Sequence, residues 1–142
     1  MRLIPEEVDK MMQVERVLAQ KHGPFTVFAL LEREDSFGRW DVVVSAPWLG
    51  TAMEDIRLVA KQVTKLLSVQ EVVTVSRIVP LPPESEFVQL LLREVRRVLP
   101  DEDGGPRRLG RSIVGDVELR RGYVLAAAEF SATREKPEAL AA

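Results

Sequence analysis

The chain has 142 residues, a formal net charge of −2, 46% hydrophobic and 30% charged side chains, which is the composition of one globular domain and not of a disordered chain. Neither half has the excess of Lys and Arg that binding to duplex DNA requires: residues 1–71 carry nine basic and eleven acidic side chains, and residues 72–142 carry eleven of each. With no Cys and a single His, the sequence excludes a thiol nucleophile, a thiolate metal site and a disulfide.

No stretch approaches the roughly 18 apolar residues of a membrane span, and the N-terminus, with Glu6 and Glu7, lacks the apolar core of a signal peptide. We therefore expect a cytoplasmic protein. Asn is absent, nine prolines are present and Arg outnumbers Lys fifteen to five. This composition is typical of either a thermophilic source or a GC-rich genome, and the sequence leaves both open.

The first three elements are marked by periodicity and by their ends. Residues 6–21 predict a helix, because Pro5 suits its first turn, apolar residues recur at helical spacing, and Gly23-Pro24 ends it. Residues 25–33 and 39–46 predict two strands joined by the turn residues between them. Together they form a β-hairpin.

The middle of the chain alternates between helix and strand. Thr51 and Glu54 have the spacing of a capping box, and they precede a helical pattern that runs to about residue 68. Residues 71–79 are rich in β-branched side chains and predict a strand. After several prolines, residues 85–99 predict a third helix.

The last third of the chain begins with a long loop over residues 100–112, which we expect to be mobile. Residues 113–120 and 123–130 predict a second hairpin that turns at Arg121-Gly122, and residues 131–142 predict a flexible tail. The sequence thus predicts a single α+β domain over residues 1–130. We expect a two-layer sandwich of order α-β-β-α-β-α-β-β, with a five-stranded mixed or mostly antiparallel sheet and the helices on one face.

His22 is the only histidine and follows the first helix directly. We interpret it as a helix C-cap residue, because a cation complements the dipole there and the sequence nominates no Ser-His-Asp arrangement around it.

Carboxylates gather around the first hairpin, where an Mg²⁺ site would need only one or two of them together with water or phosphate. The alternative is a solvated hairpin end whose charges keep a strand edge from pairing. Two arginines among these acids would partly neutralise them. The candidate residues are Glu32, Arg33, Glu34, Asp35, Arg39 and Asp41.

Over about residues 6–46 the layout of helix, strand, turn and acid-bearing strand resembles the small nucleotidyltransferases. That family ends its first strand with a Gly-Ser pair and places two metal-binding aspartates at alternate positions of the next. Here Ala29-Leu30-Leu31 occupies the first place, and Val43 follows Asp41 where the second aspartate would stand. The resemblance implies a degenerate layout that lacks the family's active-site signatures.

A second candidate site is formed by arginines near the long loop. Arg107, Arg108 and Arg111 could bind a small anion or RNA, because guanidinium groups contact phosphate and carboxylate bidentately. The alternative is a salt-bridged surface, since acids flank these arginines.

Trp48 lies in a short connection after the second strand, so its large ring must pack on something. It is either a lid on the core or an anchor in a protein interface, where Trp is a common hot-spot residue.

These observations lead us to expect a non-enzymatic regulatory or scaffold protein without cofactor, which acts through protein–protein contact as a homodimer. Several strands have apolar residues on both faces, and helices on one face alone would leave the other as an exposed apolar patch. The alternative is a divalent-metal-dependent (Mg²⁺) or nucleotide-binding protein that uses the acidic hairpin.

Overall fold

The computed structural model describes residues 6–36, 38–97 and 106–127. It confirms an α+β fold, with one more helix and one more strand than the sequence predicts. The elements follow in the order α1 (Glu6–His22), β1 (Val27–Arg33), β2 (Trp40–Ser45), α2 (Met53–Leu66), α3 (Val69–Val72), β3 (Val75–Pro80), α4 (Glu86–Arg96), β4 (Arg107–Leu109), β5 (Ser112–Val114) and β6 (Val117–Ala127).

The six strands of the described residues belong to one mixed sheet of order β3-β2-β1-β6-β4, and β5 also pairs with β6. The two short strands β4 and β5 follow one another along the side of β6 that faces away from β1. Only β2 and β3 are parallel among the pairs formed by the described strands, and α2 and α3 lie in the connection between them. Because β4 and β5 pair with different parts of β6 on the same side, they share one edge of the sheet.

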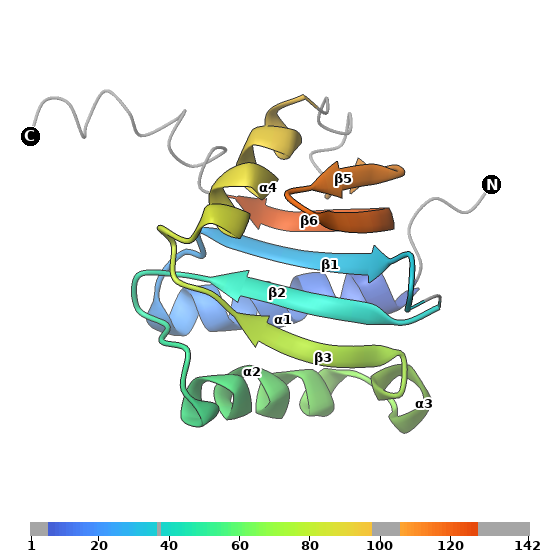
Figure 1. Ribbon diagram of the computed structural model, residues 1–142. Coiled ribbons are helices and arrows are strands. Elements are labelled where there is room, and N and C mark those ends of the chain that lie inside the picture. Colours follow the sequence, from blue (N-terminus) through green and yellow to red (C-terminus); the bar gives the residue numbers. More distant parts are fainter. Residues whose placement is uncertain (1–5, 37, 98–105, 128–142) are drawn as a thin grey trace, which may run out of the picture.

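The helices lie on both faces of the sheet and not on one, which corrects the two-layer expectation. Figure 1 shows α1 behind the sheet and α4 in front of it, near β1 and β6. The core is divided in the same way. Residues of α1 and α2, such as Met11 and Val63, pack with Phe28 and Val42 of the strands, whereas Leu91 and the other buried residues of α4 pack with the opposite face.

Every residue of β2, and all of β1 except Arg33, is buried, because the central strands are covered on both sides. The sequence-based argument for a dimer assumed that one face of these strands is open. Since α4 covers it, that argument does not hold, and the homodimer itself stays a prediction.

The first hairpin is confirmed, with Leu31 opposite Asp41 and Val27 opposite Ser45. The start of α2 differs slightly from the predicted capping box. The carboxylate of Asp55, not of Glu54, accepts hydrogen bonds from the backbone N–H groups of Gly50 and Ala52, both at 3.0 Å. This carboxylate satisfies donors at the helix start and suits its positive end.

The predicted hairpin over residues 113–130 is wrong in its turn. The chain turns at Gly115, whose φ is +63°, and β6 then runs without interruption through Gly122. A side chain at position 122 would have little space. A Cβ atom there would come within 2.8 Å of Leu31 Cδ2 and 3.1 Å of the Leu30 carbonyl oxygen. A glycine inside a strand often marks such a close approach instead of a turn.

Within the predicted loop over residues 100–112, Arg107–Leu109 form β4 and Ser112 begins β5, so the second half of the loop is part of the sheet. Residues 100–105 and the predicted tail over 131–142 lie outside the described residues. None of the described helices is long and apolar enough to cross a membrane.

Candidate functional site: a cleft at Asp41

The two buried carboxylates of the first hairpin, Glu32 and Asp41, lie on opposite faces of the sheet. In β1 the side chain of Glu32 shares the face of Leu30, which packs toward α1, since side chains alternate along a strand. In β2 Asp41 shares the face of Val43, which packs toward α4. The sheet therefore separates Glu32 from Asp41, and these two carboxylates do not come together at one site.

Glu32 is 1% exposed, and each of its two oxygens accepts a hydrogen bond. Arg121, directly opposite on β6, donates from Nε to Oε1 at 2.6 Å, and the backbone N–H of Gly38 donates to Oε2 at 2.7 Å. Arg120 Nε lies 3.6 Å from Oε2. Burial by itself raises the pKa of this carboxyl, but the hydrogen bonds from Gly38 and Arg121 and the charges of both arginines outweigh it and hold the pKa below 4.5. Glu32 therefore has a structural role, because it joins β1 to β6 and to the turn of the hairpin.

Asp41 is engaged on one oxygen only. Its Oδ2 accepts from Arg33 Nε at 2.8 Å and from Arg77 Nη2 at 3.2 Å. Its Oδ1 is buried and has no hydrogen-bond partner. A buried acceptor without a donor is unusual and costs free energy, so it requires an explanation.

Asp41 lines a cavity of about 210 Å³ between the sheet and the start of α4, which we call the Asp41 cleft. Its walls are mainly apolar and come from β1, β2, β3, β6, the connection into α4 and the first turn of α4. They consist of Leu31, Val43, Val79, Leu81, Phe87, Val117 and Leu119, and Arg33 and Arg77 complete the lining beside Asp41.

A second, more polar hollow of about 360 Å³ adjoins the cleft and shares Arg33, Arg77 and Val117 with it. Its other lining residues are all acidic, and we call them the acidic rim: Glu34, Asp35, Asp116 and Glu118. Two of them are already paired. Asp35 accepts from Arg33 Nη1 at 2.7 Å, and Glu34 lies 3.3 Å from Arg111 Nη1.

The other predicted binding residues do not converge. Arg39 is exposed at the hairpin turn. Arg107 donates from Nη1 to the carbonyl of Val95 at 3.1 Å in the last turn of α4, and burial lowers its pKa. Arg108 lies opposite Tyr123, on the other face of the sheet from Arg107, and Arg111 contacts Glu34. The structure therefore does not bring these three arginines together, and the contact of Arg111 with Glu34 is in line with the alternative of a salt-bridged surface.

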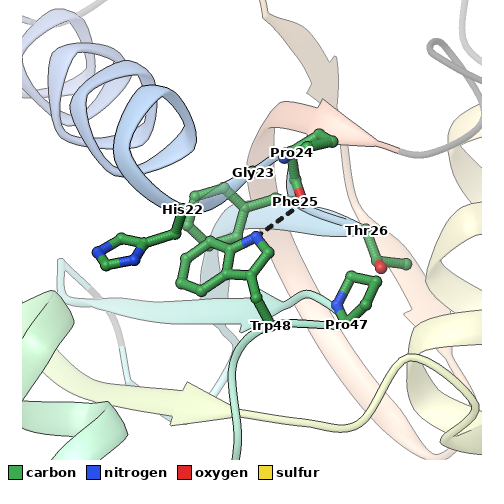
Figure 2. A pocket seen from close by; sticks show the side chains of 7 residues that line it. All are labelled: His22, Gly23, Pro24, Phe25, Thr26, Pro47 and Trp48. Atoms are coloured by element: carbon green, nitrogen blue, oxygen red, sulfur yellow. Dashed lines mark hydrogen bonds between the residues drawn. The ribbon is translucent and has the colours of Figure 1, made fainter.

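Trp48 closes one end of the core on the α1 side (Figure 2). Its indole Nε1 donates to the Pro24 carbonyl at 3.0 Å, its ring stacks on His22 at 5.0 Å, and it meets the edge of Phe25 at 5.0 Å. These residues line a shallow hollow of about 520 Å³. The satisfied N–H and the ring contacts favour the lid interpretation, and His22 ends α1 as the sequence predicts.

Among the residues that the structure describes, no group of three or more His, Cys, Asp or Glu side chains could hold a metal ion. Comparison with known proteins found no matching family model, no matching curated protein and no matching solved structure.

Sequence reasoning found Arg33 and Asp41 but missed Arg77, Leu81 and Phe87. Arg77 carries a signal of its own, as a charged side chain inside the β-branched run of a predicted strand. Leu81 and Phe87 carry none, because only the path of the chain from β3 into α4 brings them over Asp41.

Proposed function

We propose that this chain is a non-enzymatic, cytoplasmic binding protein that acts through contact with a partner protein, and that the Asp41 cleft receives one side chain of that partner. The observation that carries the proposal is the cleft itself: apolar walls around a buried carboxylate with one unused acceptor oxygen. Its volume of about 210 Å³ is below the roughly 300–1,000 Å³ of small-molecule sites. It suits the single anchoring side chain around which protein interfaces are often organised.

The metal-dependent or nucleotide-binding alternative has less support. Glu32 and Asp41 lie on opposite faces of the sheet, and the oxygens of Glu32 are occupied by donors from this chain. A thermal-shift screen with Mg²⁺ and nucleotides distinguishes the two functions, because a ligand that binds the folded state raises its melting temperature. A saturable shift with either would favour the alternative.

The direct test fills the cleft. Val79 lines it from β3, and Val79→Phe places a ring in it without introducing a charge. Val73→Phe is the matched control, because Val73 is 64% exposed and outside the cleft. We expect partner proteins captured from the source cell by the wild type and by Val73→Phe to be lost with Val79→Phe, while both variants keep the wild-type circular dichroism. Equal capture by all three proteins contradicts the proposal.

A further inference from the structure

We infer that the Asp41 cleft recognises a tyrosine side chain of the partner, whose phenol O–H donates to Oδ1 of Asp41. This inference rests on the proposed function and specifies which side chain the cleft takes. It follows from the hydrogen bonds of Asp41, the charges around it and the nature of the cleft walls.

The hydrogen bonds of Asp41 show that its carboxylate lacks a donor to Oδ1. Arg33 and Arg77 both donate to Oδ2, so the remaining capacity of the carboxylate is concentrated on Oδ1. A ligand that contributes an acceptor gains nothing there. A ligand that contributes one O–H or N–H donor removes a buried unsatisfied group.

The charges indicate that this donor is neutral. Arg33 donates to both Asp41 and Asp35, and Arg77 donates to Asp41, so the charge of the Asp41 carboxylate is already compensated by groups of this chain. An ammonium or guanidinium group would bring a further positive charge beside Arg33, and a carboxylate would be repelled by Oδ1 of Asp41. A guanidinium fork would also find only one free oxygen, whereas its geometry matches two.

The walls favour an aromatic body for this donor. Seven apolar side chains, including the ring of Phe87, surround the space, and the arginines can lie against the face of a ring. Tyrosine combines an apolar ring with a terminal O–H, and it is common among interface anchors. Serine and threonine would leave the apolar walls without contact.

Oδ1 is covered in the free protein, so a neighbouring side chain must move before a donor reaches it. Arg77 is suited to this movement, because its side chain is 57% exposed and its contact to Asp41, at 3.2 Å, is the longer of the two. Displaced outward, it would meet the acidic rim, which shares Arg77 with the cleft. The same acids favour basic residues beside the tyrosine of the partner.

The test uses small probes of known chemistry on the whole protein. p-Cresol, toluene, n-butylamine and butyrate are titrated separately, and binding is followed by the backbone amide NMR signals of Val79, Leu81 and Val117. We expect p-cresol to bind about tenfold more tightly than toluene, because a hydrogen bond to a charged acceptor is among the stronger ones. In Asp41→Leu, which has no acceptor, the two should bind equally.

Asp41→Leu should still fold, because Arg33 keeps Asp35 as its partner and Arg77 can turn to solvent. The comparison of p-cresol with toluene on the wild type tests the inference even if this variant does not fold. A peptide series then tests the source of the phenol: acetyl-Lys-Tyr-Lys-amide should bind more tightly than the peptides with Phe in place of Tyr or with Glu in place of Lys.

Each outcome has a distinct meaning. Equal binding of p-cresol and toluene, or tighter binding of n-butylamine or butyrate, overturns the tyrosine inference and leaves the cleft as a contact site. If p-cresol binds but the tyrosine peptide does not, the cleft accepts a phenol but not one carried by a protein, and the tyrosine inference is overturned. If no probe shifts the amides of the cleft, both the inference and the proposed function fail.

Discussion

Replacing Glu32 by Gln should destabilise the protein strongly, although the two side chains have the same shape. Glu32 accepts two short hydrogen bonds, from Arg121 at 2.6 Å and from Gly38 at 2.7 Å. Glutamine keeps one carbonyl oxygen and turns its NH₂ group toward the other donor. Hydrogen bonds to a charged group contribute about 1.5–3 kcal/mol each, and the remaining bond becomes a weaker neutral one. Because the Arg121 side chain is 51% exposed, its charge can be solvated, which limits the penalty. We expect a loss of about 2–4 kcal/mol.

For a chain of this length that loss corresponds to a fall of roughly 6–15 °C in melting temperature, measured by calorimetry and by urea unfolding at pH 7. Glu34→Gln is the matched control from the same hairpin. Glu34 is 28% exposed, and its ion pairs to Arg111 and Arg120 are longer, at 3.3 and 3.7 Å, so its loss should cost less than about 1 kcal/mol. The reasoning is refuted if Glu32→Gln unfolds within 1 kcal/mol of the wild type, or if both variants lose the same amount.

Four further predictions concern stability and association. The folded-state pKa values of Glu32 and Glu71 are lowered from 4.5, so the stability that these two carboxylates contribute is present above that pH and is lost as the pH falls through the folded-state pKa values. In acid titration, the free energy of unfolding of Glu32→Gln should therefore fall less steeply than that of the wild type. Gly122→Ala should cost about 1–3 kcal/mol in urea unfolding, because its Cβ would lie 3.1 Å from the backbone carbonyl oxygen of Leu30 and would displace the buried side chain of Leu31, and a neutral result would contradict the close approach. A thermophilic origin predicts a melting temperature above about 70 °C, whereas a value of roughly 45–65 °C would leave genome composition as the explanation. Light scattering tests the predicted homodimer: twice the chain mass of 16.0 kDa is expected for it, and a mass near 16.0 kDa would contradict it.

The elements with strong local signals were predicted well. The first helix was predicted over residues 6–21 and ends at His22, because its end is encoded by adjacent residues: Gly23 adopts φ +125°, where glycine is at no disadvantage. The first hairpin also depends on neighbouring residues, since two apolar strands and the turn residues between them are close together in the sequence. Information of this kind is contained within a window of the sequence.

The parts that failed depend on tertiary packing. The apolar residues on both faces of β1 indicated correctly that both faces are buried, but they did not identify α4 as the cover. Gly122 was interpreted as a turn residue because glycine is common in turns, whereas its reason is the proximity of Leu31 in the neighbouring strand. Leu31 is 91 positions away from Gly122 in the sequence, so this contact cannot be inferred from the residues around Gly122.

The sequence predicts part of the candidate site, namely Arg33 and Asp41, but not Arg77. Arg33 and Asp41 are diagonal neighbours once Leu31 is placed opposite Asp41, so their ion pair follows from the hairpin register. The same register excludes a joint site for Glu32 and Asp41, because a residue adjacent to Leu31 points to the other face. Arg77 enters through the parallel pairing of β3 with β2, which a helical crossover creates and which the sequence does not specify.

The two buried carboxylates of the hairpin thus differ in one respect that bears on function. Glu32 faces donors from β6 and from the turn, and these occupy both of its oxygens. Asp41 faces the opening between the sheet and α4, where Arg33 and Arg77 converge on one oxygen and leave the other unused. Selection for stability alone would favour an apolar residue at a position like that of Asp41, because a half-satisfied buried charge stabilises less than a well-packed side chain. The partner donor that we propose would satisfy this unused acceptor and remove its cost on binding.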